Sequence, residues 1–135
     1  MNQQFNLDTS HFTLTCDGLE RISRLSRTQL PFEEKIDIAR SFIAIERSLL
    51  DIPGGKRRLL FDMRDGTRLL RPALEAEFHQ PFAALVRGFE RVAVLHQSAV
   101  GKLQIQRFAR ESELSLQVFI NANLAEAFLK SSDEA

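Results

Sequence analysis

The sequence is poor in the residues that build disulfide scaffolds and stacking surfaces. Its 135 residues include one cysteine, no tryptophan and no tyrosine, whereas phenylalanine occurs 11 times. A single cysteine excludes an intramolecular disulfide and a cysteine cluster for a metal. Cys16 alternates with Phe12 and Leu14, which predicts a small buried side chain rather than a reactive thiol. The phenylalanines predict an aromatic core, and the missing polar-tipped aromatics argue against a large stacking interface.

An excess of either charge is also missing, because Lys plus Arg and Asp plus Glu number 18 each. Nucleic-acid binders usually carry a basic excess, since neutralising phosphates supplies most of their non-specific affinity. The one basic run, Lys56-Arg57-Arg58, precedes an apolar segment and is typical of a solvated loop. We therefore expect no nucleic-acid partner.

Long apolar runs are absent as well. No stretch approaches the roughly 18 uncharged apolar residues of a membrane span, so we expect no transmembrane segment. The start of the chain, Met1 to Phe5, shows no basic region followed by an apolar run, which predicts a cytoplasmic protein without a secretory signal. With 44% hydrophobic and 27% charged residues the composition is that of a globular chain, so residues 1–135 are expected to form a single domain.

The segment Phe32–Leu50 gives the strongest helical pattern. Its apolar residues form two rows at spacings of three and four, which together predict a helix with a broad buried stripe. The first row is Phe32, Ile36, Ala39 and Ile43, and the second is Ile38, Phe42, Ile45 and Leu49. The segment Pro72–Phe89 repeats the spacing. Because Pro81 donates no backbone hydrogen bond, we expect a kink or break near residues 78–81.

Two shorter helices are predicted towards the end of the sequence. Ser98 is expected to cap the first of them. Its inner face is expected to carry Val100, Leu103 and Phe108. Asn123, with Glu126 three residues later, resembles a capping box for a last helix that runs through Lys130.

Short apolar runs between the helices predict strands buried on both faces. These runs are Arg58–Met63, Arg91–His96 and Leu116–Ile120. Phe12–Cys16 alternates like a strand. The apolar spacing after it favours a helical turn, whereas the serines and arginines around Leu25 suit an exposed strand. We expect a hairpin that turns at Asp17-Gly18.

The element order β-β-α-β-α-β-α-β-α predicts an α/β fold with a single, mostly parallel sheet and an N-terminal antiparallel hairpin. Four segments of the chain are similar to a known family, and they are Leu59–Arg64, Arg91–Leu95, Val118–Asn121 and Ala125–Leu129. In order and apolar character they resemble the STAS domain of anti-sigma-factor antagonists and the broader SpoIIAA-like superfamily, which includes lipid-binding members. The resemblance covers roughly residues 12 to 130, and no diagnostic motif supports it.

One part of the antagonist pattern is missing. In the phosphorylated antagonists, the first of these runs leads to an Asp-Ser-Ser-Gly segment whose serine is the kinase target. Here the corresponding stretch is Asp65-Gly66-Thr67-Arg68, in which Thr67 is the only hydroxyl. The resemblance therefore implies a STAS-like fold and a regulatory or binding role, but not the sigma-factor pathway.

Polar residues follow the carboxyl ends of the predicted parallel strands, where open α/β sheets bind their ligands. The candidate ligand- or partner-binding residues are Asp62, Arg64, Asp65, Thr67, His96, Ser98 and Lys102, with Asn121 and Asn123 after the last strand. Loops at both ends of a sheet are usually polar, so polar residues alone do not indicate a site. A binding site would require these side chains to lie close together at one edge of the sheet. Asp62 is expected to accept hydrogen bonds from backbone amides or an arginine, and Arg64 to reach outward.

No catalytic or metal site is predicted, and no cofactor is implied. Asp62, His96 and Ser98 suggest an acid–base pair and a nucleophile by residue type alone, and Ser98 is already explained as a helix cap. The histidines share no ligand spacing, and the segment before Lys102 lacks the first glycine of a phosphate-binding loop.

We therefore expect a non-enzymatic regulatory or protein-interaction module that has a protein partner or forms a homodimer. The alternative is a small-molecule or lipid-binding domain, like the lipid-binding members of the same superfamily. That alternative predicts an apolar pocket beside the helix Phe32–Leu50.

Overall fold

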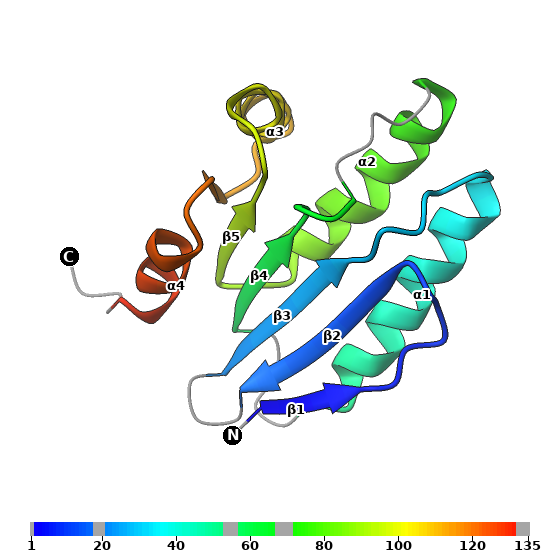
Figure 1. The fold of residues 1–135 in the computed structure, drawn as a ribbon, viewed down its shortest axis with the longest axis horizontal. Helices are drawn as coiled ribbons and strands as arrows, with labels where there is room; N and C mark the ends of the chain where they lie inside the picture. Colours follow the sequence, from blue (N-terminus) through cyan, green and yellow to red (C-terminus); the bar gives the residue numbers. More distant parts are fainter. Residues whose placement is uncertain (1, 18–20, 53–56, 67–71, 132–135) are drawn as a thin grey trace.

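The computed structural model describes residues 2–17, 21–52, 57–66 and 72–131. Within them, six strands form one mixed sheet and four helices pack against it (Figure 1). The strands are β1 (Asn2–Phe5), β2 (Phe12–Asp17), β3 (Ile22–Arg27), β4 (Arg58–Asp62), β5 (Arg91–Leu95) and β6 (Gln117–Phe119). The helices are α1 (Lys35–Leu50), α2 (Pro72–Arg87), α3 (Ala99–Glu111) and α4 (Ala122–Lys130). None of these helices is both long and apolar enough to cross a bilayer.

The strands lie in the sheet in the order of the sequence. β1, β2 and β3 pair antiparallel, whereas β3 to β6 pair parallel. This confirms the predicted α/β fold with an N-terminal hairpin, and the order fits a STAS-like topology. Of the expected turn, Asp17 ends β2 and Gly18 lies outside the described residues. The edge strand β1 was not predicted, because four residues with Phe5 as their only apolar member carry no alternating pattern.

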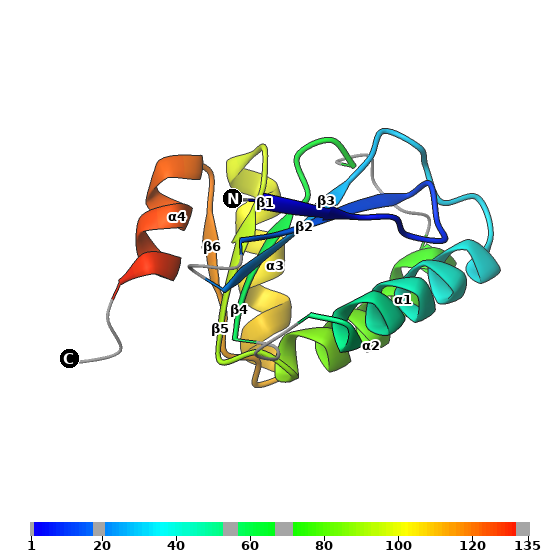
Figure 2. The ribbon, with the colours of Figure 1, turned by 90° about the horizontal axis from the view of Figure 1, so that it is seen from below.

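Helices cover both faces of the sheet. Because successive side chains of a strand point to opposite faces, the hydrophobic core consists of two clusters, one on each face. The larger cluster, between the sheet and α1–α3, contains Phe61 of β4; the smaller one, beneath α4, contains Leu60. Figure 2 shows α4 on the side of the sheet opposite α1 and α2. Cys16 is buried in the larger cluster, which confirms the prediction that it is a small buried side chain.

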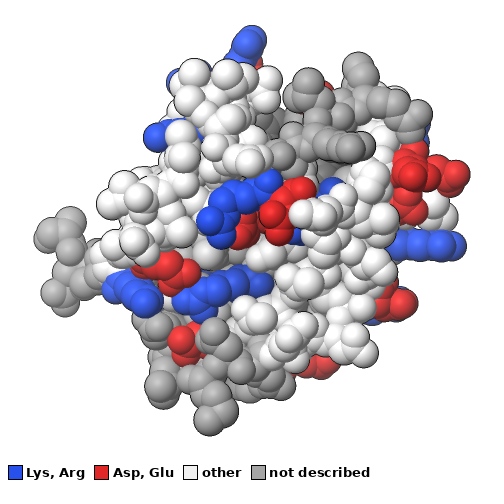
Figure 3. Space-filling view, viewed as in Figure 1, with Lys and Arg blue, Asp and Glu red and all other residues white. Residues whose placement is uncertain are grey.

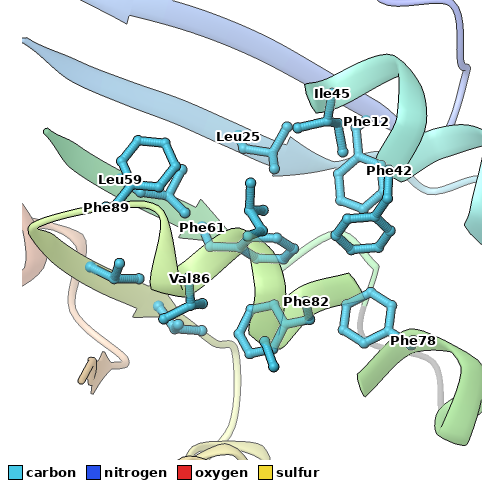
Figure 4. Close-up of a cluster of buried hydrophobic side chains, with 14 of the residues drawn as sticks. Phe12, Leu25, Phe42, Ile45, Leu59, Phe61, Phe78, Phe82, Val86 and Phe89 are labelled. Carbon is cyan, nitrogen blue, oxygen red and sulfur yellow. The ribbon is translucent and has the colours of Figure 1, made fainter. Parts of the chain in front are cut away.

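The larger cluster is the predicted aromatic core. Figure 4 shows Phe61 of β4 between Phe12 of β2 and the α2 residues Phe78 and Phe82. The ring centroid of Phe61 lies 5.9 Å from that of Phe12 and 5.1 Å from that of Phe82, both in edge-to-face geometry. Aromatic pairs favour such geometry, so these rings contribute more than their buried area alone.

Helix α1 departs from its prediction in two ways. It begins at Lys35, and the Asp37 carboxylate accepts hydrogen bonds from the amides of Glu34 and Glu33, at 3.1 and 3.2 Å. These bonds hold the pKa of Asp37 below its usual value. The broad buried stripe is also wrong, because only the second predicted row packs on the sheet. Ile36 and Ile43 of the first row are 48% and 52% exposed, since a helix on the outside of a sheet buries one side only.

Helix α2 runs from Pro72 to Arg87 without interruption, so the break expected from Pro81 does not occur. The amide that Pro81 lacks would have bonded the carbonyl of Glu77, one turn earlier. Glu77 is exposed, so water can satisfy that carbonyl.

The inner face of α3 was predicted correctly only for Phe108, which packs against the larger cluster. Val100 and Leu103 are 66% and 65% exposed. The helix instead turns Gly101 and Ala109 inward. It can do so because Gly101 lets the first turn approach the end of β5 closely.

The cap of α4 also differs from its prediction. Asn121, rather than Asn123, caps the helix by accepting a hydrogen bond from the Leu124 amide at 3.0 Å. Glu126 belongs to no capping box and binds Arg24 of β3 through two hydrogen bonds of 2.7 and 3.0 Å.

Candidate functional site

A pocket of about 440 Å³ lies at the carboxyl ends of β3, β4 and β5, between those strand ends and the helices α2 and α3. From the strand ends it is lined by Arg27, Met63, Gly66 and His96, with Phe32 from the segment before α1. The helices contribute Glu75, Phe78, His79 and Phe82 from α2, and Ser98, Val100, Gly101, Gln104, Ile105 and Phe108 from the start and body of α3. Its place at this edge agrees with where open α/β sheets bind ligands.

Strand alternation explains why these particular residues line the pocket. Phe61 and Val94 face the larger core, so the residues two positions later, Met63 and His96, leave their strands on the same side. Asp62 leaves β4 on the opposite side. Asp62 and His96 therefore cannot act as an acid–base pair. Among the described residues, no group of three histidine, cysteine or acidic side chains could hold a metal ion.

Arg27, the last residue of β3, brings a positive charge to the pocket wall. It is only 6% exposed, and its Nη1 and Nη2 atoms donate to the carbonyls of His11, Thr28 and Leu30 at 2.6, 3.4 and 3.1 Å. Burial lowers the pKa of Arg27 to about 10, which leaves the guanidinium charged at neutral pH. No carboxylate in the described part of the chain forms an ion pair with it.

The surroundings of Arg27 are aromatic and tightly fitted. Its Cζ atom lies 4.2 Å from the ring centroid of Phe32 and 5.3 Å from that of Phe12, a cation–π arrangement. The turn after β4 touches its other side, because a Cβ atom on Gly66 would lie 2.7 Å from Cβ and 2.8 Å from Nε of Arg27. A glycine at position 66 therefore lets this turn close over the arginine.

His96, directly after β5, presents a defined tautomer. Its Nδ1 atom accepts hydrogen bonds from the backbone amides of Gln97 and Ser98, at 2.9 and 3.3 Å. The ring proton therefore sits on Nε2, which has no hydrogen-bond partner among the described residues. Burial lowers the pKa of His96, which favours this neutral form. Ser98 caps α3 as predicted, its Oγ accepting from the Gly101 amide at 3.0 Å.

The opposite wall is apolar and aromatic. Phe78 and Phe82 of α2 stack with centroids 5.7 Å apart, and His79 stacks on Phe108 of α3 at 4.2 Å. At the start of α2, the Glu75 carboxylate lies 3.7 Å from the His79 ring, and both side chains are more than a third exposed. The pocket thus joins an apolar body to a few polar groups from the strand ends.

The other predicted site residues lie outside the pocket. Asp62 accepts from the Arg64 amide at 3.0 Å and from its guanidinium at 2.8 to 3.3 Å, which confirms the expectation for Asp62. Arg64 folds back onto this carboxylate instead of reaching outward, and the bonds raise its pKa. Asp65 is exposed, and neither it nor Lys102 lines the pocket. Thr67 lies outside the described residues.

The sequence prediction missed most of the pocket wall. Arg27 stands among serines at the end of a hairpin strand, where an arginine is ordinarily solvated, and Phe78 and Phe82 follow a core pattern. The pocket expected beside the helix Phe32–Leu50 is lined by that segment only at Phe32, and α1 contributes no residue to the described wall.

The surface gives no sign of a nucleic-acid interface on the face seen in Figure 3, where basic and acidic side chains lie next to one another. Comparison with protein-family models, with curated protein sequences and with solved structures finds no match for the chain.

Proposed function

We propose that this chain binds a small organic molecule in the pocket at the carboxyl ends of β3, β4 and β5. The observation that carries this proposal is the pocket itself: its 440 Å³ falls within the roughly 300–1,000 Å³ of known ligand sites. Its mainly apolar wall with a few polar groups is the composition such sites share. The strand order supports the further proposal that the chain is a STAS-like member of the SpoIIAA-like superfamily, some of whose members bind lipids.

The proposed role is binding without a reaction. Ser98 Oγ is engaged as a helix cap, and His96 Nδ1 is engaged by two backbone amides. A nucleophile needs a free base within hydrogen-bond reach, and this serine lacks one in the described residues. The function is therefore that of a carrier or a ligand-sensing module.

Binding of the neutral apolar fluorophore N-phenylnaphthylamine tests this function. Gln104 is exposed on α3 and lines the pocket, so Gln104→Trp should fill the pocket without disturbing the core. Gln106 is also exposed on α3 but does not line the pocket, which makes Gln106→Trp the matched control. We expect saturable binding to the wild type and to the control, weakened about tenfold, or ~1.4 kcal/mol, in Gln104→Trp. Equal binding to both variants would refute the proposal.

A second candidate function is a protein contact through α1. Ile36, Ile43 and Leu50 recur at intervals of seven residues and are 48%, 52% and 78% exposed. They lie on one side of the helix, away from the buried row, and that interval is the one at which helix pairs place their contact residues. We propose that this row pairs with α1 of a second copy of the chain, which would make the protein a homodimer.

A further inference from the structure

The pocket wall carries a positive charge at Arg27, and no carboxylate among the described residues forms an ion pair with it. Arg27 is only 6% exposed, and it contacts carbonyl oxygens and aromatic rings. Carbonyls and rings stabilise a cation only in part, and a buried charge without a counter-charge is costly. A guanidinium has five N–H donors, and three hydrogen bonds to carbonyls are found here, so two donors have no hydrogen-bond partner among the described residues.

Two neighbours strengthen this positive end. Ser98, Val100 and Gly101 at the start of α3 line the same pocket, and the first turn of a helix carries the positive end of its dipole. His96 adds an unpartnered Nε2–H donor, and it does so in its neutral form. Together these groups favour oxygen atoms that carry negative charge.

Glu75, the one carboxylate among the described lining residues, does not cancel this preference. Glu75 has a side chain that is 56% exposed, and it lies beside His79 at the start of α2. Water therefore screens its charge far more than that of buried Arg27.

The charge count limits the ligand further. Among the described residues that line the pocket, Arg27 is the only lysine or arginine. A single buried cation matches a single anionic group, whereas nucleoside di- and triphosphates are normally held by several basic groups or a metal ion. The remaining wall, with Phe32, Phe78, Phe82 and Phe108, suits an aromatic or aliphatic body.

We infer that the pocket selects a small amphipathic monoanion, with its carboxylate or sulfonate beside Arg27 and its apolar body between α2 and α3. This inference rests on the proposed binding function and deepens it. A phosphate monoester shares the oxygen chemistry but carries more charge than the single cation matches.

A matched pair of fluorophores tests the inference on the wild-type protein. Anilinonaphthalene sulfonate has the same ring system as N-phenylnaphthylamine and adds one sulfonate. We expect the sulfonate to bind the wild type about tenfold more tightly, and naphthoate to displace it about tenfold better than naphthamide. The naphthoate pair shows whether the site takes carboxylates as well as sulfonates.

Variants then assign the preference to Arg27. Arg27→Met should abolish the difference between the two fluorophores, and Arg27→Lys should restore part of it. Arg64→Met is the control, because Arg64 is an arginine at the same edge of the sheet that lies outside the pocket. It should keep the full preference. Circular dichroism identifies any variant that fails to fold, and in that case the wild-type fluorophore and competition measurements decide.

The outcomes separate the inference from the function on which it rests. Saturable binding of N-phenylnaphthylamine with no gain from the sulfonate, or a preference that survives in folded Arg27→Met, overturns the monoanion inference alone. Failure of both fluorophores to bind saturably overturns the proposed function itself.

Discussion

The imidazole of His96 occupies the space that any side chain at position 101 would need. A Cβ atom on Gly101 would lie 1.9 Å from Cε1 and 2.4 Å from Nε2 of that ring. The end of β5 and the first turn of α3 therefore meet at a contact that only glycine permits. This contact holds the histidine at the pocket wall, which makes Gly101 a positioning residue for the site.

The first prediction concerns Gly101→Ala. Alanine is favoured over glycine in a helix by up to ~1 kcal/mol, so the substitution would stabilise an uncrowded helix. Here we expect it to lower the free energy of unfolding, because the new methyl group forces the His96 ring out of place. Urea denaturation measures the change, and N-phenylnaphthylamine binding should weaken in parallel.

The matched control is the same substitution in a His96→Ala background, where the ring is gone. There Gly101→Ala should become neutral or stabilising, so the double-mutant cycle gives a coupling between the two positions. A stabilising effect of Gly101→Ala in the wild type would mean that the contact between helix and ring is not a constraint.

A second prediction is that acid weakens the fold through His96. Burial lowers the pKa of the folded histidine below the value near 6.5 that it has in the unfolded chain. The unfolded chain then binds more protons than the folded one, so the free energy of unfolding falls as the pH drops below about 6.5. His96→Asn keeps an oxygen acceptor for the Gln97 and Ser98 amides but does not titrate. Its advantage over the wild type should grow as urea unfolding is repeated from about pH 7.5 down to 5. Parallel pH profiles would show that His96 does not contribute.

The third prediction concerns the ion pair that fastens α4 to the sheet. Arg24 and Glu126 lie 2.7 Å apart with side chains 20% and 26% exposed. Glu126→Gln keeps the shape but removes the charge, and we expect it to cost about 1 kcal/mol of unfolding free energy. The hydrogen bond from Arg24 lowers the pKa of Glu126. Its stabilisation is therefore present above the unfolded pKa of 4.5 and is lost as the pH falls through the lower, folded value.

Glu111→Gln serves as the control for that ion pair. Arg107 and Glu111 also form a pair, at 3.4 Å, but their side chains are 74% and 62% exposed. Solvent and salt screen such a pair, so its loss should cost less than about 0.5 kcal/mol in urea denaturation. Equal losses in Glu126→Gln and Glu111→Gln would contradict a structural role for the α4 ion pair.

Local pattern predicted the sheet well and the pocket poorly, for a physical reason. Alternation along β4 was enough to separate Asp62 from Phe61, and a short apolar run marked β5, because strand periodicity is local. Burial of Arg27 depends on rings from β2 and from the segment before α1, which come together only in the folded chain. No local pattern predicts that contact.

The helices show the same limit. Both apolar rows of α1 have helical spacing, and only the position of the sheet decides that Ile38 is buried and Ile43 exposed. In α3 the inward position is a glycine, which hydrophobic patterning does not recognise as an inner face. The prediction therefore included two residues that line the pocket, His96 and Ser98, and missed the charged and aromatic walls.

The last prediction is that Ile43→Asp abolishes self-association. Ile43 is the middle residue of the exposed row on α1, so in a pair of α1 helices a carboxylate there would be buried without a partner. In the single chain the residue is 52% exposed, and the substitution should change the free energy of unfolding by less than about 0.5 kcal/mol. Sedimentation velocity over a range of protein concentrations should show a monomer–dimer equilibrium for the wild type and monomer alone for Ile43→Asp.

Leu124→Asp is the control, since Leu124 is 60% exposed on α4 and lies across the sheet from α1. It should dimerise like the wild type, because it adds the same charge at an apolar surface residue outside the row. A wild type that stays monomeric at every concentration, or equal effects of the two substitutions, would rule out the α1 pair.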